Sequence, residues 1–149
     1  MVSVVIVAPG QGSQTPGFLE PWLAEPRFAE HLGALSEAAG IDLARHGTVS
    51  DADTIRDTAI AQPLIVAASI MSLAAVLDEG SGSGWKSKTA GIAGHSVGEV
   101  AAAAGAGILS EPDAMKLVAA RGTAMAAAAA QVATGMSAVI GADQADETR

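Results

Sequence analysis

The pentapeptide Gly94-His95-Ser96-Val97-Gly98 places a serine between two glycines, where an apolar run meets a helical pattern. Residues 89–93 favour a short buried strand, and the alanine-rich residues 99–104 favour a helix. A sharp strand-to-helix turn strains the serine backbone, and glycines two positions before and after it avoid clashes with neighbouring backbone. The pattern predicts a nucleophile elbow, with an ordinary glycine-bounded turn as the alternative.

An elbow serine needs donors for the oxyanion that forms beside it. The N–H of Val97 opens the helix and points in the right direction for this role. A second strand is predicted at residues 1–8, followed by the loop Gly10-Gln11-Gly12. Thr15 stands where the dinucleotide-binding fingerprint requires glycine, so nucleotide binding is disfavoured. We expect the backbone N–H of Gln11 to supply the second oxyanion donor.

The composition favours one α/β domain. The chain has 149 residues, of which 50% are hydrophobic and only 3% aromatic, so its core must be built from small aliphatic side chains on closely packed helices. A net charge of −8 argues against nonspecific binding to nucleic acid or to an anionic membrane surface. The absence of cysteine excludes disulfides, thiolate nucleophiles and cysteine zinc sites.

Two apolar segments resemble targeting or membrane signals. The first segment, residues 1–8, has no preceding Lys or Arg, and Pro9-Gly10 ends it. It is therefore predicted to be a strand and not a signal peptide. Residues 59–77 approach membrane-spanning length, but Gln62 and Pro63 interrupt them and no basic anchor follows. We predict a buried helix from Pro63 to Leu77, a cytoplasmic location and no membrane partner.

The other elements follow from spacing and capping. An amphipathic helix is predicted at 27–39, and Ser110 is a strong N-cap for a helix that runs to about residue 131. Further expectations are short helical turns at 41–45 and 51–56, a flexible connection at 81–84 and a strand at 136–140.

Arg121 is the second informative residue. Its helical neighbours Leu117, Val118, Ala124 and Met125 are all apolar, so its charge has no partner within its own helix. A guanidinium in such surroundings suits bidentate capture of a carboxylate. The alternative is that Arg121 extends to solvent or pairs with a distant acid.

A serine nucleophile also needs a base. The chain has only three histidines, His31, His46 and His95. His95 adjoins Ser96, so its side chain should project away from the position of a general base. His31 lies on the amphipathic helix and His46 at a helix end. We expect none of them to be the base.

Four motifs together resemble the malonyl-CoA:acyl carrier protein transacylases and the related acyltransferase domains of polyketide synthases. They are Pro-Gly-Gln-Gly-Ser-Gln at 9–14, Ala-Gln-Pro at 61–63, Gly-His-Ser-Val-Gly-Glu at 94–99, and Arg121. The resemblance covers essentially the whole chain. It implies an α/β-hydrolase-like core with a parallel sheet at residues 1–133, and the first strand of an inserted, truncated ferredoxin-like subdomain at 134–149.

The resemblance also implies a mechanism. Ser96 would attack the malonyl thioester of coenzyme A, and the N–H groups of Gln11 and Val97 would form the oxyanion hole. Arg121 would hold the free malonyl carboxylate. The acyl group would then pass to the phosphopantetheine thiol of acyl carrier protein, with ping-pong kinetics.

The remaining implied pocket residues are Gln62 and His95. No metal and no cofactor are expected, since the coenzyme A thioester is itself the substrate. Family members are about twice as long, and their catalytic histidine lies in a later segment. We therefore expect the 149 residues alone to be inactive. A serine hydrolase with the same elbow and a noncatalytic interaction fragment are the alternatives.

Overall fold

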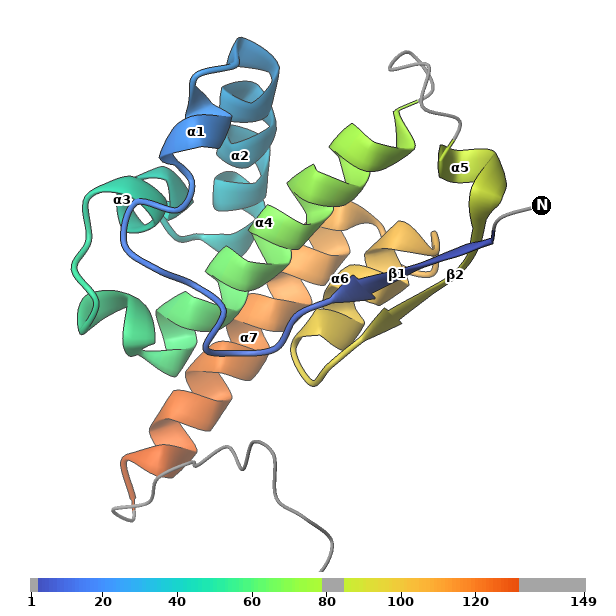
Figure 1. The fold of residues 1–149 in the computed structure, drawn as a ribbon. Helices are drawn as coiled ribbons and strands as arrows, with labels where there is room; N and C mark the ends of the chain where they lie inside the picture. Colours follow the sequence, from blue (N-terminus) through green and yellow to red (C-terminus); the bar gives the residue numbers. More distant parts are fainter. Residues whose placement is uncertain (1–2, 79–84, 132–149) are drawn as a thin grey trace, which may run out of the picture.

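The computed structural model describes residues 3–78 and 85–131 (Figure 1). Strands β1 (Val4–Ala8) and β2 (Thr89–Gly94) pair in parallel, with Ala8 opposite Gly94. A long helical crossover joins them, as parallel neighbours require. The predicted α/β class and the parallel pairing of these strands are confirmed.

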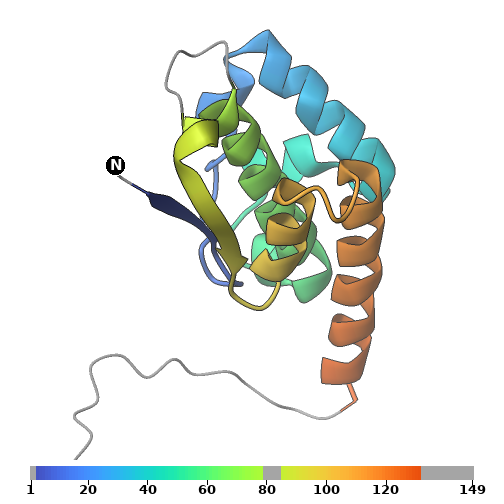
Figure 2. The ribbon, with the colours of Figure 1, turned by 90° about the vertical axis from the view of Figure 1, so that its right-hand side faces the viewer.

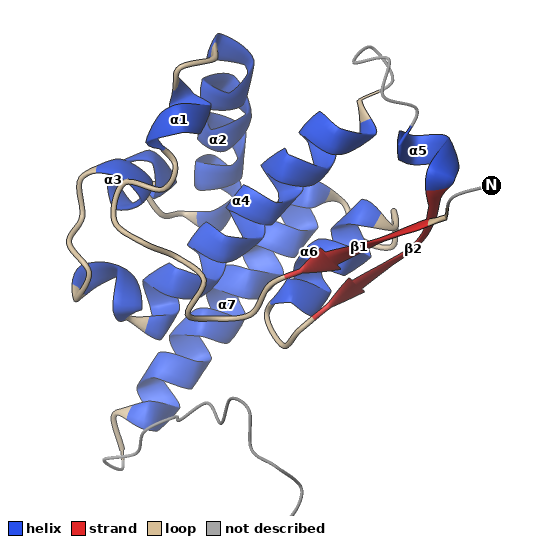
Figure 3. Cartoon of the chain, in the orientation of Figure 1, coloured by secondary structure: helices blue, strands red, loops and turns tan. Residues whose placement is uncertain are grey.

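Helices make up most of the described chain (Figure 3). The predictions at 27–39, 99–104 and 110–131 are confirmed, whereas two four-residue helices, α1 and α5, were not predicted. The turn expected at 41–45 lies two residues later, because Asp42 caps it through the N–H of Arg45. The bounds are α1 Glu20–Leu23, α2 Pro26–Ala39, α3 Leu43–Thr48, the 3-10 turn η1 Thr54–Arg56, α4 Thr58–Leu77, α5 Trp85–Lys88, α6 Gly98–Gly105 and α7 Glu111–Ala129. The connection at 81–84 and the strand at 136–140 lie outside the described residues.

Helix α4 begins earlier than expected. The prediction placed its start at Pro63, but it begins at Thr58, where the Asp57 carboxylate accepts from the N–H of Ala59 at 2.8 Å. Pro63 lies inside the helix and forgoes a hydrogen bond to the carbonyl of Ala59. The cap and the burial of the following turn hold the first residues helical despite the proline.

Helix α4 also forms the centre of the core, where it packs against α7, α6 and α2. Leu64 and Met71 on α4 and Met115 and Val118 on α7 are fully buried. Among the described residues, α4 is the one helix long and apolar enough to cross a membrane, and 56% of its apolar window is buried within the protein. The prediction of a buried helix is confirmed.

The helices cover one face of the strand pair (Figure 2). On the opposite face, Val5 is 61% exposed and Val7 is 67% exposed. Parallel strands are usually covered on both faces. Within residues 3–78 and 85–131, this side of the sheet has no covering layer.

Ser110 caps α7 as predicted. Its hydroxyl oxygen accepts from the N–H of Asp113 at 3.2 Å. Replacing Ser110 with alanine should lower the free energy of unfolding by about 1 kcal/mol, because one N–H of the first turn loses its acceptor. Urea denaturation measures this change. Ser110→Thr should recover most of the loss, and equal stability of the alanine variant would contradict the capping role.

Candidate active site

The predicted site residues gather at the carboxyl ends of the two strands. Because β1 and β2 are parallel, the loops that follow them leave at the same edge of the sheet. The N–H of His95 donates to the carbonyl of Ala8 at 3.1 Å, which ties the elbow to the end of β1. The loop after β1 then passes the first turns of α4 (Figure 3), where the Gln11 side chain contacts Thr58.

Ser96 has the strained backbone that an elbow requires. Its φ of 53° makes it the one non-glycine residue with a positive φ in the described part of the chain. A Cβ on Gly94 would overlap the backbone of Gly98, and a Cβ on Gly98 would overlap the carbonyls of Ala8 and Pro9. Both glycines are therefore required by close backbone approach, as the pentapeptide predicts.

Two backbone N–H groups at this edge have no acceptor among the described residues. The N–H groups of residues 98–100 all donate to carbonyls within the elbow turn. Those of Val97 and Gln11 bond to no acceptor among the described residues. Free N–H groups at the start of a helix attract negative charge, so the N–H of Val97 is suited to an oxyanion beside Ser96.

Arg121 reaches across from α7 to the elbow. Its Nη2 donates to Ser96 Oγ at 3.2 Å, and its Nη1 donates to Gln62 Oε1 at 2.6 Å. No carboxylate lies within ion-pair distance of Arg121 in the described ranges. The guanidinium is thus oriented by neutral groups, and no carboxylate of the described residues pairs with it beside the serine.

Gln62 and Gln11 extend this polar contact. Gln62 on α4 is buried, with 1% of its surface exposed. Its Nε2 donates to Gln11 Oε1 at 3.4 Å and to Met125 Sδ at 3.3 Å. Gln11 Nε2 in turn donates to Thr58 Oγ1 at 3.2 Å. Thr58 and Met125 were not among the predicted site residues. The available signal for Met125 was its spacing, one helical turn after Arg121.

The three histidines lie at separate points of the structure. His95 is exposed, with its ring against Gly10. His31 Nε2 lies 2.7 Å from a carboxylate oxygen of Glu111 at the start of α7, about 15 Å along that helix from Arg121. His46 Nδ1 bonds to Ser50 Oγ at 2.9 Å. No described histidine bonds to Ser96.

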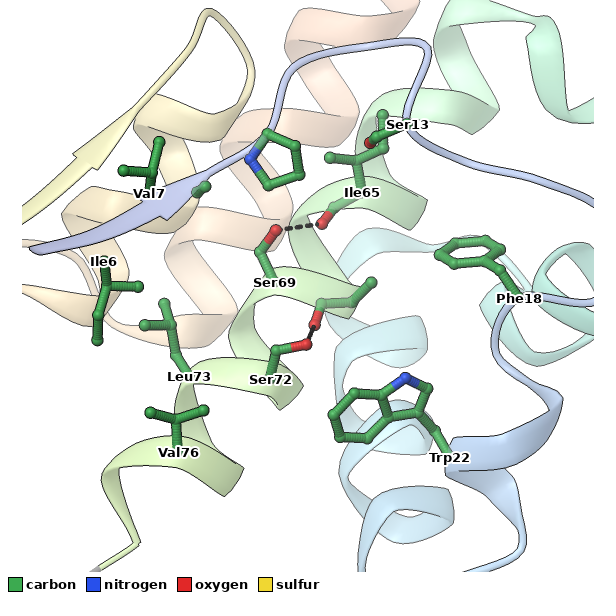
Figure 4. Close-up of a pocket in the computed structure, with 13 residues that line it drawn as sticks. Ile6, Val7, Ser13, Phe18, Trp22, Ile65, Ser69, Ser72, Leu73 and Val76 are labelled. Carbon is green, nitrogen blue, oxygen red and sulfur yellow. Dashed lines mark hydrogen bonds between the residues drawn. The ribbon is translucent and has the colours of Figure 1, made fainter. Parts of the chain in front are cut away.

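A separate apolar pocket of about 380 Å³ opens beside β1 and α4 (Figure 4). Phe18, Trp22 and Leu73 are among the side chains that line it. Ser69 and Ser72 also face it, but each donates its hydroxyl to a carbonyl of its own helix. None of the predicted site residues lines this pocket. The candidate site is located at Ser96 instead, where a strained serine meets two N–H groups and a guanidinium that have no acceptor or counter-ion, respectively, among the described residues. Among the described residues, no cluster of acidic or histidine side chains is suited to hold a metal ion.

The chain belongs to the acyl transferase domain family, whose model matches residues 5–149. A malonyl CoA-acyl carrier protein transacylase of Mycobacterium tuberculosis (strain H37Rv) is 48% identical over 143 residues, which cover 96% of this chain and 46% of that protein. The chain therefore spans about half the length of the curated relatives it matches.

Solved structures agree with this assignment. The crystal structure of MCAT from Mycobacterium tuberculosis matches with a TM-score of 0.82 and 48% identity, over 95% of this chain and 46% of that one. A complex of a type II polyketide synthase acyl-carrier protein with its malonyl-transacylase matches with a TM-score of 0.73 and 31% identity, over 85% of this chain and 40% of that one.

Proposed function

We propose that the protein transfers a malonyl group from coenzyme A to the phosphopantetheine thiol of acyl carrier protein, in fatty-acid or polyketide synthesis. The observation that carries this proposal is the Arg121 guanidinium, which contacts Ser96 Oγ and has only neutral partners among the described residues. An uncompensated cation beside a nucleophile favours a substrate with a free carboxylate. The name of the M. tuberculosis relative at 48% identity supports the same substrates.

The proposed reaction has two steps. Ser96 Oγ attacks the malonyl thioester carbon and loses its proton to a base, and the N–H groups of Val97 and Gln11 stabilise the oxyanion. The C–S bond breaks, coenzyme A leaves as its thiol, and the malonyl group remains on Ser96 as an ester. The carrier thiol then attacks this ester and restores the serine hydroxyl. We propose that the base is a histidine outside these 149 residues, as the resemblance implies.

Several finer expectations are part of the proposal. Residues 1–133 would belong to an α/β-hydrolase-like core, and residues 134–149 would begin a ferredoxin-like subdomain. His95 would line the malonyl pocket, the protein would act in the cytoplasm, and it would need no cofactor or metal. A serine hydrolase for neutral esters is less favoured, because it has no use for the Arg121 charge beside Ser96.

The proposal is tested with a chimera in which this chain replaces the matching part of the M. tuberculosis relative. Incubation of the chimera with malonyl-CoA should give a malonyl adduct on the peptide that contains Ser96, detected by mass spectrometry. Addition of acyl carrier protein should remove the adduct and yield malonylated carrier.

The isolated 149-residue chain is the matched control. It should transfer malonyl at less than about one hundredth of the chimera's rate, because general base catalysis is worth about 10²–10⁴-fold. Transfer by the isolated chain at the chimera's rate would contradict the external base. A chimera that hydrolyses malonyl-CoA without loading the carrier would favour the hydrolase instead.

A further inference from the structure

A line of side-chain hydrogen bonds joins four separate segments of the protein at the site. It begins at Thr58 in the first turn of α4 and passes through Gln11 in the loop after β1. It continues through Gln62 on α4 to Arg121 on α7. It ends at Ser96 in the elbow. We call these five side chains the amide relay.

The amide relay has only one possible direction. Arginine has no acceptor, so Gln62 must turn its oxygen toward Arg121. The Gln62 amide nitrogen then faces Gln11, which must accept with its own oxygen. Gln11 is left with its nitrogen facing Thr58, whose hydroxyl oxygen accepts at 3.2 Å. The donor-only arginine at one end therefore requires an acceptor at the other.

Burial makes this direction costly to reverse. Gln62 is 1% exposed, and its second N–H donates to Met125 Sδ. A reversed Gln62 amide would turn its N–H groups toward the guanidinium and leave buried polar atoms unpaired. Gln11 is only half-buried, so its orientation depends on the partners at its two ends. Of the two partners of Gln11, Gln62 contacts Arg121 and Thr58 does not.

The backbone holds Thr58 at a fixed distance from α7. Thr58 is the first residue of α4, directly after the Asp57 cap. A Cβ on Gly122 of α7 would lie 2.9 Å from the carbonyl oxygen of Thr58, so the two helices touch at the residue next to Arg121. The hydroxyl acceptor and the guanidinium are thus placed by one helix contact.

We propose that Thr58 is a positioning residue, which orients the amides of Gln11 and Gln62 and through them the guanidinium of Arg121 beside Ser96. The role of this orientation in substrate binding rests on the proposed function, in which Arg121 holds the carboxylate of the malonyl group. An amide relay orients the guanidinium without neutralising it, whereas a carboxylate in the place of Gln62 would compete with an anionic substrate.

The orientation is tested by NMR of the glutamine side-chain amides in the full 149-residue chain. The sequence has five glutamines and no asparagine, so the spectrum of side-chain amides is simple to assign. In the unmodified chain, the amide protons of Gln11 and Gln62 should exchange with solvent more slowly than those of the exposed Gln131. Equal exchange at all three would overturn the proposal without any substitution.

Substitutions at Thr58 then test the role of its hydroxyl group. Thr58→Val should shift the amide signals of both Gln11 and Gln62 and speed their exchange, and Thr58→Ser should restore them. Thr48→Val is the matched control, because among the described residues the Thr48 hydroxyl donates only to the carbonyl of Ala44 in its own helix. A folded Thr58→Val chain in which the Gln62 signals stay unchanged would refute the relay.

Kinetic measurements on the chimera distinguish a positioning role of Thr58 from a purely structural one. Thr58→Val should raise the KM for malonyl-CoA about three- to ten-fold, with a smaller change in kcat and no change in the KM for acetyl-CoA. Equal effects on both substrates would assign Thr58 to folding alone. If the amides respond but no malonyl reaction occurs in the unmodified chimera, the relay stands and the proposed function fails.

Discussion

Arg121→Ala in the chimera is expected to lower kcat/KM for malonyl-CoA by about 30- to 3,000-fold. The reaction with acetyl-CoA should change by less than about three-fold. The reason is that Arg121 has only neutral partners in the described structure, Gln62 and Ser96, so its charge is available to a substrate carboxylate. Acetyl-CoA has no carboxylate and gains nothing from that charge.

The measurement is a comparison of initial rates of Ser96 acylation with the two thioesters. Lys116→Ala is the matched control, because Lys116 is a cation on the same helix whose side chain is 66% exposed and pairs with Asp113 at 3.9 Å. This control should leave both rates unchanged. An equal fall with both substrates would show that Arg121 acts on the Ser96 hydroxyl and not on the malonyl carboxylate.

Local rules were sufficient to predict the elbow. The positive φ of Ser96 and the close contact of Gly94 with the backbone of Gly98 depend on a turn of five residues, and the residue types indicate that turn directly. The α7 cap at Ser110 was predictable for the same reason. Each of these features is decided by neighbours in the sequence, so no knowledge of the tertiary structure was needed.

The surroundings of Ser96 were less predictable, because they depend on how α4 and α7 cross. Spacing within α7 predicted that Arg121 has no partner in its own helix, but not that Gln62 orients it from 59 positions away. Thr58 was missed because the prediction began α4 at Pro63 and left Thr58 outside the helix. The Asp57 cap was the signal that would have found it. Helices α1 and α5 were missed because four residues are too short for a periodic pattern.

Gly94→Ala and Gly33→Ala should have opposite effects on stability. The new methyl group at Gly94 would overlap backbone atoms of Gly98 and Glu99, which cannot rotate away as a side chain could. Overpacking typically costs 1–3 kcal/mol, and we expect a loss of about 3 kcal/mol because the obstacle is backbone. At Gly33, inside α2, a methyl group meets nothing within 4 Å, so alanine should add up to about 1 kcal/mol through helix propensity.

Urea denaturation of the chain measures both changes as shifts of the midpoint at constant slope. The same pair of substitutions in the chimera separates stability from chemistry. Gly33→Ala should leave acylation of Ser96 unchanged, whereas Gly94→Ala should reduce it by more than about 100-fold, since the displaced turn carries both the hydroxyl and the N–H of Val97. If Gly94→Ala is as stable and as reactive as the unmodified protein, the close backbone contact at the elbow is not what holds Ser96 in place. Because both substitutions add the same methyl group, any difference between them reports the space around each glycine, and only the elbow glycine also governs the geometry of the nucleophile.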